Sequence, residues 1–477
     1  MGKRTQDLLA FRFLFLTFPA VLQGLLSILV LPLVMLVLTP RDYGLYGLVV
    51  AFTSIMSTLS TVGCSFILSN RFDEKDIDKS QVLVSTLQLT IFLTSTLVAI
   101  TSLVSFLLLR SRFEMLAPVT IPILLLALFD MIATGGWGVA NTVSILSRRV
   151  RLFSLFMSLR AVSVPSAVLF ALFVWNIEGP LALFIGTAAG GVTYAVGTVL
   201  IIKPYLCPKF DWQLVKHILK SGSVLSVGNM VDTFMRLAER SLLASHVSLT
   251  ATGLWTHAQL YPNMVMMAVR PATQAAWPKL CEEATEMPAT FPHGRYLARM
   301  ISLGLGTIAV MLALVGPEMI SLLTNDQFTE SAPYAALITA VAAVRFGGRP
   351  QLAIIITYGK ARSASLVTTL SAVGGITSMA ICIPFWELNG AMIGTALNGI
   401  LYLALLYGFS RKIKHSPNFD QLGIAAIALT ILVLILCQSF HFSFLQRLSF
   451  AVLIAISSGL VALFIVGRSG LLSFIKR

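Results

Sequence analysis

The sequence predicts an all-α polytopic membrane protein with about 14 transmembrane helices. Of its 477 residues, 57% are hydrophobic and only 11% are charged, whereas soluble domains carry about 25% charged residues. Long apolar runs recur along the whole chain, and short polar breaks separate them. Because lipid cannot satisfy open backbone groups, and the runs lack the alternation of barrel strands, these segments are expected to be helices. This composition excludes a soluble enzyme, a secreted module and a disordered chain.

Fourteen stretches are long enough to cross the hydrocarbon core, which takes about 20 residues. They cover residues 13–38, 44–69, 81–109, 115–146, 152–175, 180–202, 219–245, 251–277, 298–323, 331–357, 364–384, 390–409, 421–438 and 448–467. The loops between them are too short to hold an extramembrane catalytic domain, so no enzyme activity is expected. The five cysteines lie far apart, without CxxC or a histidine at ligand spacing, so neither a zinc site nor a disulfide framework is indicated.

The distribution of basic residues sets the expected orientation. The chain has 34 Lys+Arg against 20 Asp+Glu, a net charge of +14. In a membrane protein such an excess marks cytoplasmic loops and does not indicate nucleic acid. With a cytoplasmic N-terminus, 24 of the 34 basic residues fall on the cytoplasmic side, 4 on the far side and 6 inside spans. Both termini are therefore expected in the cytoplasm, and the first span is expected to be a retained helix, not a signal peptide.

An internal repeat divides the chain. IGTAAGGVTY (185–194) returns as IGTALNGILY (393–402), 208 residues later, and Trp175 and Gly179 return as Trp386 and Gly390, 211 residues later. The tripeptide GLY at 44–46 returns as GLW at 253–255. A unit of six spans starts on the same side of the membrane each time, so the two copies are expected to be parallel repeats related by a pseudo-two-fold axis along the membrane normal.

The repeat predicts four parts. They are an N-lobe of spans 1 to 6 (1–203), an amphipathic cytoplasmic linker (204–218), a C-lobe of spans 7 to 12 (219–412) and a C-terminal helix pair, spans 13 and 14 (413–477). In transporters built this way the substrate site lies between the two halves.

Nine ionisable residues fall inside the predicted spans, where a charge that faces lipid costs about 2.5 to 3.5 kcal/mol. Six are arginines and three are acidic, a balance of +3 that favours an anionic substrate, and arginine suits bidentate contacts with phosphate. The predicted substrate-binding residues are Arg236, Arg345, Arg270, Arg349, Asn263, Gln274 and Asn141. The predicted coupling residues are Asp130, Asp232 and Glu239. Neither a metal nor a cofactor is expected, apart from H⁺ or Na⁺ as a coupling ion.

Other features refine this site. Asp232 has Arg236 one turn away, whereas Asp130 has no charged partner on its own helix, so Asp130 is the favoured coupling residue. Arg160 and two further arginines near span ends can either line the cavity or extend to the membrane surface; the two others are Arg240 and Arg270. Pro262 and the run 347–350 (GGRP) are expected to kink spans 8 and 10. His257 is interpreted as a packed or interfacial histidine.

Three segments carry a family resemblance. LTPRDYGLYGLVVAFTSIMSTLSTVGCSFILS (38–69), ATGLWTHAQLYPNMVMMAVRPATQAAWPKL (251–280) and GPEMISLLTNDQFTESAPYAALITAVAAV (316–344) resemble O-antigen flippases. These polysaccharide exporters belong to the multidrug/oligosaccharidyl-lipid/polysaccharide (MOP) superfamily. The resemblance implies movement of undecaprenyl-pyrophosphate-linked oligosaccharides to the outer leaflet of the bacterial inner membrane by alternating access. It also implies membrane lipids, a polysaccharide polymerase and other assembly proteins as partners.

Two alternatives remain within the superfamily. Exporters commonly have twelve spans, whereas lipid II flippases have fourteen, so a lipid II flippase is the second interpretation. Span 1 lacks the mid-span arginine that this resemblance would imply. A cation-coupled multidrug antiporter would need an acidic cavity, and the charge balance here is positive.

The orientation predicts which cysteines an outside reagent reaches. Cys207 and Cys281 follow even-numbered spans and should lie in the cytoplasm. An impermeant thiol reagent added to intact spheroplasts should miss both residues and should label them after permeabilisation. Labelling of either residue from outside would overturn the predicted topology.

Overall fold

The computed structural model describes residues 3–61, 64, 67, 68, 72, 76–112, 116–147, 149–217, 223–264, 266, 280, 282, 283, 285, 286, 291–324, 326–358, 361–411 and 443–469. Within these residues the regular elements are helices and no strand occurs. The predicted all-α membrane fold is therefore confirmed. The chain forms two compact units, Leu14–Ser245 and Met1–Phe13 with His246–Arg477.

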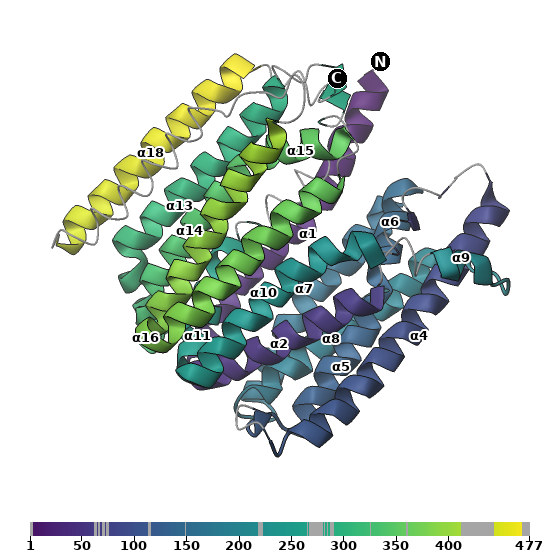
Figure 1. Ribbon diagram of the computed structural model, residues 1–477, viewed down its shortest axis with the longest axis horizontal. Helices are drawn as coiled ribbons and strands as arrows, with labels where there is room; N and C mark the ends of the chain where they lie inside the picture. The colour runs from purple at the N-terminus through teal and green to yellow at the C-terminus, as the bar shows by residue number, and fades with distance from the viewer. Residues whose placement is uncertain are drawn as a thin grey trace. The chain divides into compact units, whose positions relative to one another are not determined.

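The first unit is built around α8. It holds most of α1 (Lys3–Met35) together with α2 (Pro40–Thr61), α4 (Ile77–Leu109), α5 (Ile121–Gly135), α6 (Trp137–Leu146), α7 (Val150–Phe173), α8 (Leu181–Ile202), the 3-10 turn η2 (Lys203–Tyr205), α9 (Trp212–His217) and α10 (Ser223–His246). Helix α8 packs against α5, α6 and α7, and α2 and α4 both pack against α5 (Figure 1).

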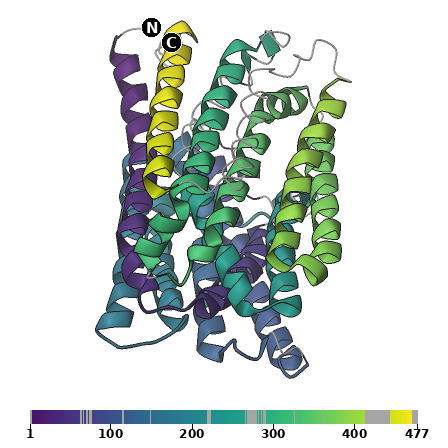
Figure 2. The same ribbon diagram turned by 90° about the vertical axis from the view of Figure 1, so that its left-hand side faces the viewer.

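The second unit is built around α13 and α14. Its elements are α11 (Leu249–Ala258), α13 (Pro292–Thr324), η4 (Thr329–Ser331), α14 (Ala332–Gly347), α15 (Arg349–Thr357), α16 (Ala361–Ser410) and α18 (Phe444–Ser469). Helix α13 packs against α14 on one side and α18 on another, as two views show (Figures 1 and 2). Arg447 of α18 donates a hydrogen bond to Glu318 of α13, which fixes the last described helix to this unit.

The helices match the predicted spans closely. Among the described residues, nine helices are long and apolar enough to cross a membrane. Helix α10 corresponds to predicted span 7, although four charged residues keep it out of that set. Predicted span 13 lies outside the described residues. The division into lobes at the linker stays a prediction, and the contacts place α10 with the first unit.

Span 4 differs in detail from the prediction, because α5 ends at Gly135 and α6 begins at Trp137. The predicted spans 11 and 12 both lie within α16, whose backbone leaves helical geometry between them at Glu387, where φ is 49°. The predicted kink in span 10 is confirmed, since α14 ends at Gly347 and α15 begins at Arg349.

The sequence repeat is also a structural repeat. A Cβ atom added at Gly186 would lie 2.9 Å from the Val164 carbonyl oxygen, and one at Gly394 would lie 2.9 Å from the Gly375 carbonyl oxygen. Gly186 and Gly394 are 208 residues apart, and Val164 and Gly375 are 211 apart. The same close helix contact therefore forms once in each unit.

Turns and helix breaks repeat as well. Asn176 and Glu387, again 211 residues apart, both have positive φ, at 52° and 49°. The α5–α6 break at Gly136 corresponds to the α14–α15 break at Gly348 within one residue. Interrupted helices at equivalent places in two halves are the sequence feature that best marks a transporter binding site.

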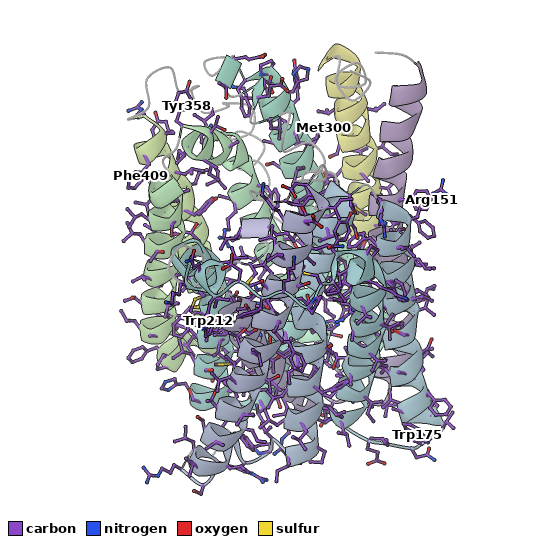
Figure 3. The ribbon with its side chains drawn as sticks, turned by 90° about the vertical axis from the view of Figure 1, so that its right-hand side faces the viewer. Arg151, Trp175, Trp212, Met300, Tyr358 and Phe409 are labelled. Carbon is purple, nitrogen blue, oxygen red and sulfur yellow. The ribbon has the colours of Figure 1, made fainter. Side chains whose placement is uncertain are left out.

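The ends of the spans carry the residues expected at membrane surfaces. Trp175 and Trp386 stand at the repeated turn and are 58% and 57% exposed. Tryptophan is enriched at the boundary between lipid and water. Arg151 lies at the other end of α7 from Trp175 (Figure 3).

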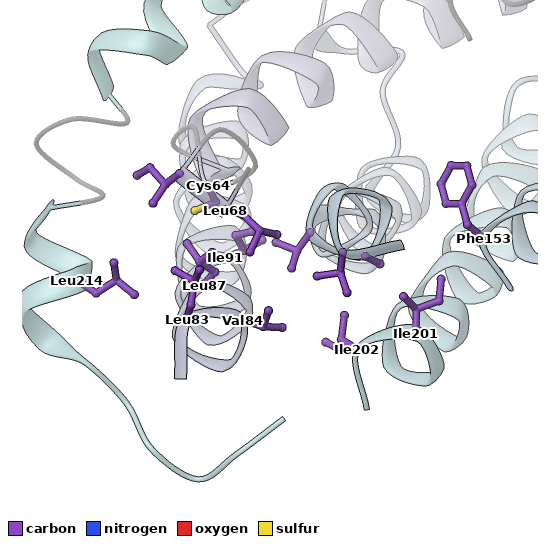
Figure 4. Close-up of a cluster of buried hydrophobic side chains, with 14 residues drawn as sticks. Cys64, Leu68, Leu83, Val84, Leu87, Ile91, Phe153, Ile201, Ile202 and Leu214 are labelled. Atoms are coloured by element: carbon purple, nitrogen blue, oxygen red, sulfur yellow. The ribbon is translucent and has the colours of Figure 1, made fainter. Parts of the chain in front are cut away.

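The segment after α8 is held against α4. The Cys207 backbone N–H donates to Ser85 Oγ at 2.7 Å, and the Asp211 N–H donates to Thr86 Oγ1 at 3.1 Å. Leu214 of α9 joins a buried apolar cluster with Leu83 and other residues of α4 (Figure 4). These contacts hold the described part of the predicted linker against α4 within the first unit.

The repeated glycine contact gives a stability prediction. Gly186→Val and Gly394→Val should each lower the free energy of unfolding by about 1–3 kcal/mol, because the new side chain would overlap a backbone carbonyl. Thermal unfolding of the purified protein in detergent measures the change. The control is Gly304→Val, whose added atoms would meet open space. Equal melting temperatures for all three variants would contradict the close packing.

Candidate functional site

A charged pair and a column of aromatic rings lie together in the middle of the first unit. Asp130 of α5 and Arg160 of α7 approach to 3.7 Å between Oδ1 and Nη1. The Arg160 guanidinium carbon lies 4.2 Å from the centre of the Tyr194 ring on α8. Tyr194 stacks on Trp137 with centroids 3.9 Å apart and an interplanar angle of 5°, and Trp137 stacks in turn on Phe153. We call these five residues the Arg160 column.

Glycines on α8 make this arrangement fit. A Cβ at Gly191 would lie 2.8 Å from Asp130 Oδ1, and one at Gly190 would lie 3.3 Å from Arg160 Cγ. Two adjacent glycines thus let α8 approach both α5 and α7 while the charged side chains occupy the space beside it. The break at Gly136 sets the direction of α6 and brings Trp137 onto Tyr194.

The two charged side chains are partly exposed. On α7 the most exposed apolar residues, Leu155 and Phe173, point about 140° away from Arg160 at about 100° per residue, and Phe170 points about 80° away. The exposed fractions are 21% for Arg160 and 23% for Asp130. Part of each side chain is therefore within reach of water or a ligand.

Polar atoms near the column lack partners. Among the described residues, Asn141 Oδ1, Ser144 Oγ, Gln88 Oε1 and Ser95 Oγ are buried and accept or donate no hydrogen bond. Buried polar groups are nearly always satisfied, and exceptions call for a water molecule or a bound group. Asn141, predicted as a substrate-binding residue, is among them.

The second unit carries a related arrangement. The Arg345 guanidinium carbon lies 5.0 Å from the centre of the Tyr402 ring. Tyr402 follows Tyr194 by the repeat distance of 208 residues. The arginines, however, come from different helices. At 211 residues, Arg345 corresponds to Thr134 and Arg160 corresponds to Ser371. In each unit an arginine therefore lies over the repeated tyrosine, but the two arginines occupy different positions of the repeat.

Comparison with known proteins now identifies the family. The family model described as polysaccharide biosynthesis protein matches residues 34–333. The chain belongs to this family. A comparison with curated proteins gives no match.

Solved structures share the fold of this polysaccharide biosynthesis family member. A lipid II flippase MurJ, in an inward closed conformation, aligns with a TM-score of 0.64 at 13% identity over 97% of this chain and 99% of its own. A multidrug resistance MATE family transporter of the MOP superfamily, facing inward, aligns with a TM-score of 0.63 at 15% identity over 83% and 94%. A mutant of the Vibrio cholerae MATE transporter VcmN gives 0.57 at 15% identity over 88% and 100%. At these identities the similarity shows the fold alone.

The structure locates some of the predicted site residues of this family member. Arg236 is exposed on α10, and Glu239 is buried on the same helix. Asn263 is exposed, and Arg345 is half-buried. The structure does not describe Arg270, Gln274 or the side chains of Asp232 and Arg349. The binding and coupling roles of all these residues stay predictions.

Two arginines settle a question that the sequence left open. Arg160 turns inward to Asp130 and Tyr194, and Arg240 donates from Nη1 to the Gly47 carbonyl oxygen at 2.6 Å. Both side chains are therefore held by contacts with other helices of the first unit. The partner of Asp130 was missed because it stands on another helix, 30 residues further along the chain.

A buried histidine lies in the second unit. His257 is fully buried, with Nδ1 2.7 Å from Ser331 Oγ, so the prediction of a packed histidine is confirmed. Among the described residues no group of three His, Cys, Asp or Glu side chains could hold a metal ion.

The neighbouring arginines of α10 should behave differently. Arg240→Gln should lower the free energy of unfolding by about 1–3 kcal/mol, because the hydrogen bond from the buried Arg240 side chain to the Gly47 carbonyl oxygen is lost. Arg236→Gln, one turn away and exposed, is the matched control and should leave stability unchanged. Thermal unfolding in detergent measures both. A larger loss for Arg236→Gln would contradict the described packing.

Proposed function

We propose that this protein is a flippase that moves an undecaprenyl-pyrophosphate-linked oligosaccharide from the cytoplasmic to the outer leaflet of a bacterial inner membrane. It works by alternating access, with both termini in the cytoplasm, and supplies repeat units for exopolysaccharide or O-antigen synthesis. It is a transporter and not an enzyme. Membrane lipids surround it, and a polysaccharide polymerase is the partner that consumes its product.

One observation carries this proposal. In a chain of the polysaccharide biosynthesis family, each unit holds an arginine over the repeated tyrosine inside its spans, Arg160 over Tyr194 and Arg345 over Tyr402. An arginine inside the membrane is energetically costly, and it is usually found where it lines a substrate pathway or a water-filled cavity. Its planar fork suits two oxygens of a phosphate group. A lipid-linked pyrophosphate supplies such oxygens, and its long apolar tail stays in the lipid beside the spans that hold these arginines.

The predicted residues take roles accordingly. Arg236 and Arg345 contact the pyrophosphate, while Arg270 and Arg349 extend the basic lining toward the cytoplasm. Polar contacts to the glycan come from Asn263, Gln274 and Asn141. Proton or Na⁺ occupancy of Asp130 resets the empty carrier, with Asp232 and Glu239 as the other acidic candidates.

A lipid II flippase is the second candidate function. The lipid II flippase MurJ aligns with 97% of this chain, whereas the inward-facing MATE transporter aligns with 83%. The C-terminal helix α18 is firmly docked on α13 and exposes apolar residues such as Leu445 and Leu453 on its other side. Both candidates use a prenyl pyrophosphate anchor, so the arginine roles hold for either. They differ in the glycan that the anchor carries.

Substitution of Arg345 tests the function directly. Arg345→Ala should abolish flipping of a fluorescent undecaprenyl-pyrophosphate-linked oligosaccharide in proteoliposomes, and Arg345→Lys should restore it only in part, because a point charge lacks the bidentate fork. Protein amount and monodispersity are checked for each variant. Full transport by the Arg236→Ala, Arg345→Ala double variant would overturn the assignment, and failure of the wild type to move any prenyl-pyrophosphate-linked glycan would overturn the function.

A further inference from the structure

We propose that Arg160 is an anion-binding residue for the substrate pyrophosphate and that Asp130 occupies it until the substrate or a proton displaces the carboxylate. This inference rests on the proposed function and adds a residue to it. Arg160 belongs to none of the binding roles assigned above. The site is the end of the Arg160 column at which the Arg160 guanidinium lies over the Tyr194 ring.

The column holds the guanidinium in a fixed place. Arg160 and Phe153 are two turns apart on α7, and between them Tyr194 and Trp137 form a continuous stack. One turn from Arg160, Ser163 Oγ lies 3.1 Å from Thr193 Oγ1 and ties α7 to α8 again. A guanidinium that is already positioned loses little side-chain entropy when it binds an anion.

The contact with Asp130 is weak enough to be replaced. Oδ1 and Nη1 are 3.7 Å apart, which is too long for a hydrogen bond. Both atoms are buried, and neither has a hydrogen-bond partner among the described residues. Two phosphate oxygens could satisfy the guanidinium better than this carboxylate does, because charge-assisted bidentate bonds are shorter and stronger.

The charged surroundings define the effect of pH. Asp130 is faced by Arg160 from α7, by Tyr194 from α8 and by Tyr46 from α2. Near the helix break at Gly136, the neighbouring side chains of α4 and α6 are uncharged. Among the described residues these are Gln88 on α4 and Trp137 on α6. Protonation of Asp130 removes the negative charge that competes for Arg160. Anion affinity should therefore rise as pH falls.

The experiment uses the full-length protein in nanodiscs with farnesyl pyrophosphate as the probe, and farnesol as the probe without the anion. Binding is measured by calorimetry between pH 5 and pH 8. The probe loses negative charge of its own as pH falls, so each variant is compared with the wild type at the same pH. Asp130→Asn should bind farnesyl pyrophosphate about tenfold more tightly than the wild type at pH 8, and this difference should shrink toward pH 5 as Asp130 of the wild type takes up a proton. Arg160→Gln should bind at least about tenfold more weakly, and adding Asp130→Asn to it should restore nothing.

The matched control is Arg151→Gln, an exposed arginine at the start of α7, which should bind like the wild type. If Arg160→Gln does not fold, Asp130→Asn and Arg160→Lys carry the test, and Arg160→Lys should keep part of the affinity. Unchanged or weaker binding by Asp130→Asn, or wild-type binding by Arg160→Gln, would overturn the inference. If these variants bind as the wild type does while proteoliposomes still flip the lipid-linked glycan, only this inference fails. If the wild type neither binds the probe nor flips a glycan, the proposed function itself fails.

Discussion

The close approach of α8 to its neighbours is the constraint on which the first unit depends. Gly186 lets α8 touch the backbone of α7, and Gly190 and Gly191 leave room for Arg160 and Asp130. In lipid there is no hydrophobic gain from bringing two helices together, so packing of small residues and polar contacts must supply the attraction. The glycines give both, because they shorten the distance between helices and leave room beside α8 for the opposite charges of α5 and α7 to meet.

The same packing, repeated in the second unit, supports different chemistry. Gly394 and Gly399 repeat the contacts of Gly186 and Gly191, but Gly399 faces Val341 where Gly191 faces Asp130. The position equivalent to Asp130 is therefore apolar in the second copy, while an arginine lies over the repeated tyrosine in both copies. The two copies share a scaffold and differ at some of its inward positions.

Much of this fold follows from sequence because the bilayer imposes strong rules. Apolar length located the spans, and the recurrence of IGTA and of Trp175 as Trp386 located the repeat, which the equal geometry of Asn176 and Glu387 confirms. The break at Gly136 was missed, since two glycines within a long apolar run are compatible with a continuous helix. The Asp130–Arg160 pair was missed for another reason. Periodicity compares residues on one helix, and this contact joins side chains of two different helices. The adjacent glycines in the repeated motif were the available signal for it.

In the proposed site, the Asp130 carboxylate controls whether Arg160 can bind an anion. An arginine that always stays exposed in a membrane cavity would hold any anion, including phosphate from the cytoplasm. A carboxylate beside it lowers that affinity and makes binding conditional on a better ligand or on a proton. At Arg160 the conditional partner is present, and the stacked rings keep the guanidinium from turning away. A carrier that must bind its substrate on one side and release it on the other needs such a difference in affinity between its states.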